Sequence, residues 1–177
     1  MEERLSQKLG IEEIKALALQ ANESHYDCDK LWTLVSSPYR IISVNALWVF
    51  THMPESGKEW LRNHQSEIVE KLIDERDVAK KRMLLQILKK QEFAKDNLPL
   101  NLLDYCLSKI NSECEPYAIR CFSIYVAFNI CKHYPELITE LEEYLEMLSY
   151  QELSPGLKSG LRQTRQDISK VKKKYRL

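Results

Sequence analysis

The sequence has little glycine or proline: four glycines and six prolines among 177 residues. A collagen-like chain needs glycine at every third position, and a β-sandwich needs many turn residues, so the first is excluded and the second disfavoured. Hydrophobic residues make up 44% of the chain and charged residues 29%, which excludes a disordered chain. The composition is that of one folded domain, or one compact array of repeats, with enough residues for a sizeable core.

The sequence also lacks a net charge and a long apolar run. Because 26 basic residues balance 26 acidic ones, no overall field draws the chain to nucleic acid or to a membrane. No apolar run reaches the roughly 18–20 residues that span a bilayer, and the opening Met-Glu-Glu-Arg-Leu has no signal-peptide pattern. The five cysteines are an odd number at scattered positions, which is typical of a reducing compartment. We therefore expect a cytoplasmic protein.

Motifs for catalysis and metal binding are missing as well. Cys114, Cys121, Cys131 and His133 form the densest group of soft ligands, but their spacing matches no zinc motif. The four histidines, at positions 25, 52, 64 and 133, belong to no known nucleophile or metalloprotease pattern. We therefore predict no catalytic residue, no metal ligand and no cofactor, and we interpret the cysteines as core residues.

The residues that are present read as one helix after another. Ile11, Ile14, Leu17 and Ala18, for example, follow the spacing of one helical face. No segment alternates in the manner of a strand with hairpin turns. The pattern predicts helices near 2–9, 11–22, 27–36, 39–53, 58–74, 76–92, 99–111, 116–134, 135–148 and 155–173.

The longer helices recur at a regular interval. They start near residues 39, 77, 116 and 155, and shorter helices lie between them near 65–74, 99–111 and 135–148. A two-helix unit that recurs at about 40 residues is typical of HEAT or armadillo repeats. The alternative is an irregular bundle in which the spacing is a coincidence.

Four segments carry a resemblance to a known group. The chain resembles small stand-alone bacterial HEAT-like proteins over roughly residues 27–171. The resemblance implies successive repeat helices and a terminal cap, in segments 39–50, 79–88, 118–137 and 154–161. Some proteins of this group are labelled adenylosuccinate lyase. Those lyases have a Gly-Ser-Ser-x-Met-Pro loop, whereas Ser36-Ser37-Pro38 has neither the glycine nor the Met-Pro, so a lyase stays a residual alternative without a motif.

The fold we predict is an all-α, right-handed superhelix of HEAT-like helix pairs, that is, an armadillo-type fold. We expect a single domain over 1–177, with N-terminal helices over 1–26, repeat pairs over 27–153 and a basic cap helix over 154–177. Such a stack exposes a long inner face that can bind a protein or peptide.

The helix near 116–134 is apolar on nearly all sides, so it must be covered by neighbours. We expect 135–148 to be its partner and 76–92 and 155–173 to be the adjacent layers. The prediction is tested by the burial of Phe122, Ile124, Val126, Phe128 and Ile130.

The three tryptophans, Trp32, Trp48 and Trp60, all lie in the first third of the chain. Trp32 and Trp48 fall on apolar stripes and are expected in the core, whereas Trp60 is expected to be partly exposed. Alkylpurine DNA glycosylases are similar in scaffold and use aromatic residues with an aspartate in a basic groove. By that resemblance Trp48 and Trp60 would act with Asp27 or Asp29, but the basic background is absent.

Charge separates sharply towards the end of the chain. Residues 134–152 contain six acids and no base, whereas residues 153–177 contain eight bases and the single acid Asp167. Two consecutive helices with opposite charges are expected to lie antiparallel with the charges facing each other. The alternative is that Lys172–Lys174 form a basic arm for nucleic acid or an acidic partner.

Our functional prediction is a non-enzymatic scaffold that binds a protein or peptide through the shorter helix of each pair. The expected contact residues are Asn63, His64, Glu67, Lys71, Asn101, Asp104, Tyr105, Lys109, Glu136, Glu140 and Glu143. The alternative is a nucleic-acid-binding or DNA-repair protein that uses the basic tail together with Arg76, Lys80 and Lys81.

Overall fold

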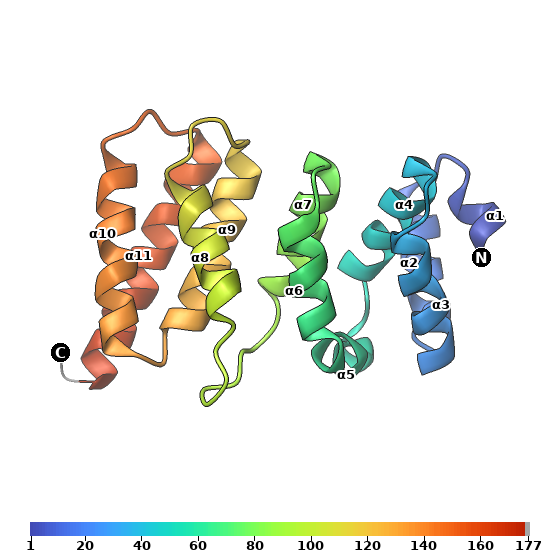
Figure 1. Cartoon of the computed structure of the whole chain (residues 1–177), viewed down its shortest axis with the longest axis horizontal. Helices are drawn as coiled ribbons and strands as arrows, with labels where there is room; N and C mark the ends of the chain where they lie inside the picture. Colours follow the sequence, from blue (N-terminus) through green and yellow to red (C-terminus); the bar gives the residue numbers. More distant parts are fainter. Residues whose placement is uncertain (176–177) are drawn as a thin grey trace. The chain divides into compact units, whose positions relative to one another are not determined.

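A computed structural model describes residues 1–175, with the side chains of His25, Tyr26, Ser56 and Tyr175 left aside. The chain divides into two compact units, Met1–Ile87 and Leu88–Leu177, and each is described by itself. Figure 1 shows the succession of helices along the chain. The described residues contain no strand, so the predicted all-α fold class is confirmed.

The first unit is built around α4, a helix that is apolar on most of its surface. Ala46, Leu47 and Phe50 of α4 are fully buried, because α1, α2 and α3 all pack against this helix. In chain order the unit contains α1 (Glu2–Leu5), α2 (Ile11–Ala21), α3 (His25–Val35), α4 (Arg40–Thr51), the short 3-10 helix η1 (Glu55–Gly57), α5 (Lys58–Asn63), α6 (Gln65–Asp74) and α7 (Val78–Leu88), whose last residue belongs to the second unit.

One predicted helix is divided in the structure. The sequence predicts a continuous helix over 58–74, but α5 ends at Asn63 and α6 begins at Gln65. His64 lies between them with φ −105° and ψ 17°, outside the regular helical values. Its ring stacks on Trp60, with 3.8 Å between the ring centroids. The stacking of His64 on Trp60 therefore accompanies the interruption between α5 and α6. Hydrophobic periodicity does not predict this interruption.

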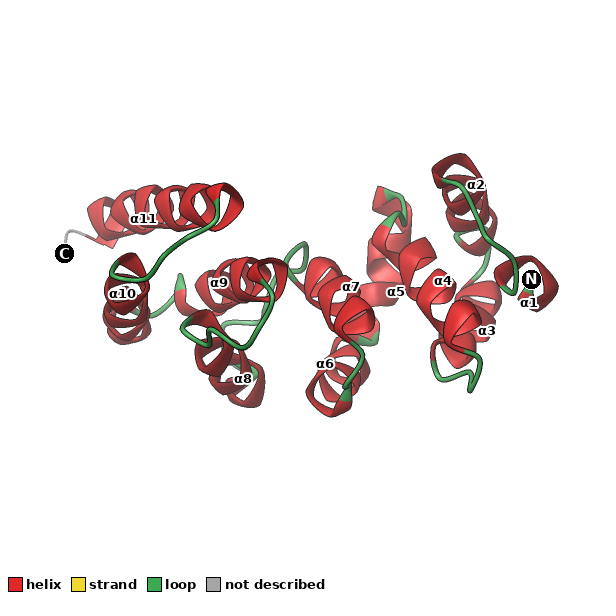
Figure 2. Ribbon diagram, turned by 90° about the horizontal axis from the view of Figure 1, so that it is seen from above, coloured by secondary structure: helices red, strands yellow, loops and turns green. Residues whose placement is uncertain are grey.

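The second unit is a two-layer arrangement of four helices. In chain order it contains α8 (Leu100–Ile110), α9 (Tyr117–Cys131), α10 (Pro135–Ser149) and α11 (Pro155–Tyr175). Figure 2 shows α8 and α10 in one layer and α9 and α11 in the other. Helix α9 packs against α10 and α11, as the sequence predicts, and most extensively against α8, which the sequence did not name as a neighbour.

The burial test on α9 separates two classes of residue. Ile124, Val126 and Ile130 are fully buried, and Phe122 and Phe128 are half-buried. None of the five is mostly exposed, so the covered position predicted for this helix is confirmed.

Prolines mark the helix boundaries throughout the described residues. Proline lacks a backbone N–H and fixes φ, so it is tolerated before a helix or at its first position but not inside it. The structure follows this rule at every proline: two residues before α4, before η1, before α8, before α9, and as the first residue of α10 and α11. The boundaries of the repeats are thus specified locally.

Gly160 of α11 has a clear packing role. A Cβ atom there would lie 2.7 Å from the Sγ of Cys121 and 3.2 Å from the hydroxyl of Tyr125, both on α9. These distances are shorter than van der Waals contact, so the absent side chain lets α11 approach α9 closely. Among the described residues, no helix is both long and apolar enough to cross a bilayer.

Candidate functional site

The first candidate surface joins α3 to α6 in the first unit. The indole Nε1 of Trp32 donates to Oε2 of Glu67 at 3.2 Å, and Nζ of Lys71 donates to Oγ of Ser36 at 3.1 Å. On each helix these residues are four apart, so they share one face. We call the surface formed by Trp32, Ser36, Asn63, Glu67 and Lys71 the α3–α6 face. Asn63 and Glu67 are exposed on it, and Lys71 is half-buried.

Beneath this face lies an aromatic cluster centred on Trp60. Only 2% of Trp60 is exposed, and its Nε1 donates to Oδ1 of Asp29 at 2.8 Å. His64 stacks on one side of the indole and Phe50 on the other, with ring centroids at 3.8 and 5.1 Å. The predicted partial exposure of Trp60 is therefore wrong. The carboxylate satisfies the indole N–H, so the ring can be buried without an unpaired polar group.

One pair of the glycosylase-like combination, Trp60 with Asp29, is in contact, but Trp60 is buried in the core. Trp32 and Trp48, both predicted in the core, are only half-buried. Trp48 on α4 lies edge-on to His52, with 6.3 Å between the ring centroids. Asp27 accepts a hydrogen bond from the hydroxyl of Ser24 at the start of α3. Asp29 is bonded to Trp60, which is in the core. The two acids thus have structural roles at these positions.

On α8, the predicted contact residues fall into two pairs. Asn101 and Asp104 are exposed. Tyr105 and Lys109 are half-buried and lie together, with Nζ of Lys109 5.1 Å from the Tyr105 ring centroid and 3.1 Å from Oε1 of Glu115. Burial, followed by the charge of Glu115, raises the pKa of the Tyr105 phenol. Tyr105 therefore stays neutral, and Lys109 is held by an ion pair rather than free to meet a partner.

On α10, the predicted contact residues Glu136, Glu140 and Glu143 are all exposed. They differ from Glu142 and Glu146 of the same helix, which face α11. The exposed acids therefore form a separate strip of negative charge on α10.

The two C-terminal helices are joined by the facing charges that the sequence predicts. Arg165 lies 2.8 Å from Glu146, and Lys172 lies 2.5 Å from Glu142. Lys172 is thus part of the contact between α10 and α11, whereas Lys173 and Lys174 are exposed. Arg176 of the predicted basic cap lies outside the described residues.

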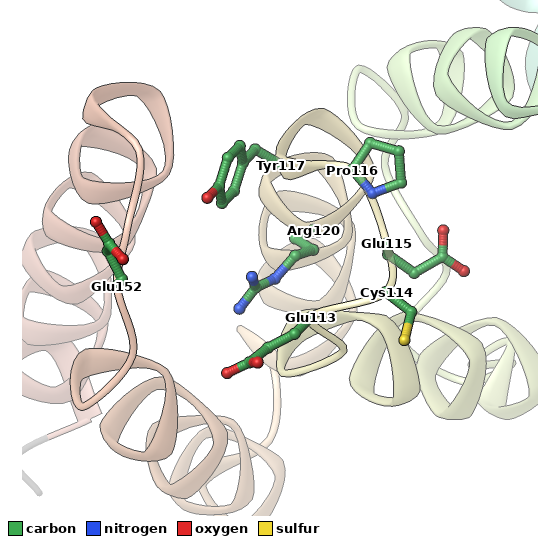
Figure 3. A pocket seen from close by; sticks show the side chains of 7 residues that line it. All are labelled: Glu113, Cys114, Glu115, Pro116, Tyr117, Arg120 and Glu152. Carbon is green, nitrogen blue, oxygen red and sulfur yellow. The ribbon is translucent and has the colours of Figure 1, made fainter.

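A hollow of about 620 Å³ lies in the second unit, between the α8–α9 connection and the α10–α11 connection (Figure 3). Its floor is Arg120, of which only 2% is exposed. The Nε of Arg120 donates to the carbonyl of Ile110 at 2.9 Å, and Nη2 donates to the side-chain oxygen of Gln151. The residues that line the hollow are Glu113, Cys114, Glu115, Pro116, Tyr117, Arg120 and Glu152.

The order and spacing of the helices are those of a helical repeat. Comparison with known families shows which type of repeat it is. A family model described as a HEAT repeat domain matches residues 1–168. The chain belongs to the HEAT repeat family. No curated protein matches it. The armadillo-type fold predicted from the sequence is confirmed.

The family assignment fits a helical-repeat scaffold, since HEAT repeats commonly mediate protein interactions. The match to the HEAT repeat family covers residues 1–168, whereas the resemblance seen in the sequence covers 27–171. The match to the HEAT repeat family gives no support to the lyase alternative.

The cysteines of this HEAT repeat protein divide by burial. Cys28, Cys106 and Cys131 are buried, as the core interpretation predicts, while Cys121 is half-buried and Cys114 is exposed. Burial raises the pKa of Cys28 to about 11 and that of Cys131 to about 12. Among the described side chains, no group of three His, Cys, Asp or Glu residues lies close enough to hold a metal ion. The side chain of His25 is outside the described set.

Some of the basic residues proposed to bind nucleic acid are paired with acids or partly buried. Nζ of Lys80 lies 3.9 Å from Glu75, and Arg76 is exposed. Lys81 of the same segment is half-buried. These three residues therefore do not form an open basic patch like those on which phosphate binding relies.

Sequence reasoning found the α3–α6 face in part and missed the hollow. Glu67 and Lys71 were named from the position of the shorter helix, but their partners on α3, Trp32 and Ser36, were not. Arg120 is a charged residue in the otherwise apolar helix α9. A buried arginine in such a helix is the signal that could have pointed to the hollow.

Proposed function

We propose that this HEAT repeat protein is a non-enzymatic scaffold that binds a protein or peptide through the exposed side chains of α6, α8 and α10. The observation that carries the proposal is the α3–α6 face. Its hydrogen bonds fix the side chains of α6 before a partner arrives. Groups that are already ordered lose less conformational entropy on binding, so a fixed face binds more tightly than a mobile one.

The acidic strip of α10 supports the proposal in a second way. The acids of α10 that face α11 are paired with Arg165 and Lys172. Glu136, Glu140 and Glu143 point elsewhere and are exposed, so their charge is available to a partner. A partner with basic side chains suits this strip, because complementary charge speeds association and favours the correct partner.

Charge reversal at Glu140 and Glu143 tests the proposal. The double variant Glu140→Lys, Glu143→Lys should reduce capture of a stoichiometric partner about tenfold or more. Capture is measured by affinity purification of the tagged protein from the native cell, followed by quantitative mass spectrometry. The helical content and the melting temperature should be unchanged, since both side chains are exposed.

The matched control is Glu23→Lys, Asp96→Lys, which makes the same change of charge at two exposed acids in turns. It should leave capture intact. Equal capture by both double variants and the unaltered protein would remove the α10 strip from the proposed binding surface.

The second candidate function is nucleic-acid binding. It is favoured by a smaller hollow of about 260 Å³ at the start of α11, lined by Pro155, Lys158, Ser159 and Arg162. Retention on DNA that weakens steeply as salt rises would support it, because phosphate contacts release counterions. Absence of retention at low salt would exclude it.

A further inference from the structure

The hollow in the second unit has a buried positive charge at its floor. Only 2% of Arg120 is exposed. Arginine is rarely buried without an acid, because removing its charge from water is costly unless an opposite charge or several hydrogen bonds compensate. Among the described residues no carboxylate lies within ion-pair distance of Arg120. Within the described part of the chain, its charge is therefore met by hydrogen bonds and not by a paired carboxylate.

The two hydrogen bonds of Arg120 hold the guanidinium in place without neutralising it. Both acceptors, the carbonyl of Ile110 and the side chain of Gln151, are uncharged. Gln151 is fixed in turn, because its Nε2 donates to the carbonyl of Asn111 at 3.2 Å. A guanidinium has five N–H donors, so donors remain on the side that lines the hollow (Figure 3). A fixed guanidinium with free donors matches a carboxylate, which can accept two parallel bonds.

The start of α9 adds to this preference. Pro116 and Tyr117 line the hollow, and α9 begins at Tyr117 and runs for 15 residues. The first N–H groups of a helix have no partner within it, and they carry a partial positive charge that favours an anion. Arg120 lies in the first turn of the same helix, so both effects act at one place.

The rim of the hollow has the opposite charge. Glu113 lies beside the guanidinium and Glu152 lies across the hollow from it, and both are exposed (Figure 3). Tyr117, which is 50% exposed, forms a further wall. A simple anion would be repelled by the two glutamates, whereas a ligand that carries a cation beside its carboxylate would satisfy both charges. The phenol ring of Tyr117 can face such a cation.

The size of the hollow also excludes a bare ion as its natural occupant. About 620 Å³ falls in the range of small-molecule sites, roughly 300–1,000 Å³. This space accepts an amino acid or the last residues of a peptide.

We propose that the hollow binds a small zwitterion, with its carboxylate on Arg120 and its ammonium or guanidinium group between Glu113 and Glu152. The chemistry is that of a free basic amino acid or of a C-terminal lysine or arginine of a peptide. The ion pair of Glu115 with Lys109 links this site to α8, but the site does not depend on the partner proposed for the α6, α8 and α10 surfaces.

Cys114 supplies a reporter within the hollow itself. Its thiol is exposed and lines the hollow, whereas the other four cysteines are buried or half-buried. Burial raises the pKa of Cys28 and Cys131, so few of those thiols are in the reactive thiolate form at neutral pH. A ligand in the hollow should therefore slow the alkylation of Cys114. The variant Cys114→Ser measures the background from the other thiols.

The experiment compares four probes by their effect on the rate of Cys114 alkylation in the full chain. The probes are arginine, N-acetylarginine, argininamide and the tripeptide Gly-Gly-Arg. Arginine or Gly-Gly-Arg should slow the reaction in a saturable manner, and argininamide, which lacks the carboxylate, should need at least about tenfold more ligand. Protection by arginine alone identifies a free amino acid, and protection by N-acetylarginine and Gly-Gly-Arg identifies a peptide terminus.

Two variants test the roles of the residues. Glu113→Gln, Glu152→Gln removes the charges of the rim at exposed positions, so the protein should fold and bind arginine roughly tenfold or more weakly. Glu23→Gln, Asp96→Asn is the matched control at two exposed acids outside the hollow, and it should bind normally. Arg120→Lys keeps the charge but loses the paired donors, and it should abolish the preference for the free carboxylate over the amide.

The proposal is overturned if no probe slows alkylation at roughly 10 mM, a concentration well above a weak Kd of about 1 mM. It is also overturned if argininamide protects as well as arginine, or if the rim variant binds as tightly as the control. Amide chemical shifts provide a second readout, and they should change around residues 113–120 and at 151–152.

Discussion

The two units of this HEAT repeat protein have the same kind of helices but different cores. All three tryptophans lie in the first unit, where Trp32, Phe50 and Trp60 pack with His64. The core of the second unit is mostly aliphatic, with Phe93 and two buried cysteines. The comparison teaches that the repeat specifies where apolar residues fall and leaves their chemical type free.

Polar groups are also used differently in the two units. In the first, hydrogen bonds from Trp32 and Lys71 join helices at the surface. In the second, Arg120 and Gln151 join the end of α8 to the α10–α11 connection from a buried position. The first unit thus offers a face, and the second offers a hollow.

Of the changes that test this difference between the two units, removal of the Trp60 side chain should have the largest effect on stability. Trp60→Ala deletes a ring that is only 2% exposed and leaves Asp29 without its partner. We expect a loss of about 3–5 kcal/mol in the free energy of unfolding. Urea denaturation followed by tryptophan fluorescence and by circular dichroism measures it.

Trp48→Ala is the control for this change, because Trp48 is half-buried and outside the cluster. It should cost clearly less. Equal losses for the two variants would show that the aromatic cluster has no special role in the first unit.

The close approach of α11 to α9 gives the next prediction, in the second unit. Gly160→Ala places a Cβ atom 2.7 Å from the Sγ of Cys121, so that side chain must shift or the two helices must move apart. We expect a loss of about 1–3 kcal/mol from overpacking, reduced by the better helix propensity of alanine, worth up to about 1 kcal/mol. Thermal unfolding followed by circular dichroism measures the net effect.

Gly156→Ala, in the same helix, is its matched control. No atom lies within 4 Å of a Cβ at Gly156, so this variant should be neutral or slightly stabilising. If Gly160→Ala is as stable as Gly156→Ala, the tight contact between α9 and α11 does not exist in solution.

The charge pairs between α10 and α11 should have the smallest effect. Arg165→Gln and Lys172→Gln remove the partners of Glu146 and Glu142. Each pair is exposed or partly exposed, so each variant should cost about 0–1 kcal/mol, and the cost should shrink as salt is added. Unfolding at low and high salt checks this, and a larger, salt-independent loss would indicate that these side chains act through packing instead.

Much of the fold could be predicted from the sequence because its signals are local. Proline positions mark the starts of α8, α9, α10 and α11, and the apolar character of α9 predicts its covered place. The charge change between residues 134–152 and 153–177 correctly predicts the pairing of α10 with α11. Each of these signals lies within one or two neighbouring helices.

The remaining features depend on contacts between distant residues. Trp60 is buried because Asp29, 31 positions earlier, accepts its N–H, and no periodicity reveals that pairing. The hollow needs Arg120 and Gln151 to meet, also 31 positions apart. The α3–α6 face could be predicted only by half, since the sequence identifies an exposed helix face but not its partner helix.

Photo-crosslinking in the native cell tests the proposed scaffold most directly. A photoreactive amino acid replaces Asn63 at the end of α5, Asn101 on α8 or Glu140 on α10, all of which are exposed. In the control variants it replaces Lys8, Glu23 or Asp96, which are exposed as well. The proposal predicts a covalent adduct with one common protein from the first three positions and none from the controls. Adducts from the controls alone, or from no position, would contradict it.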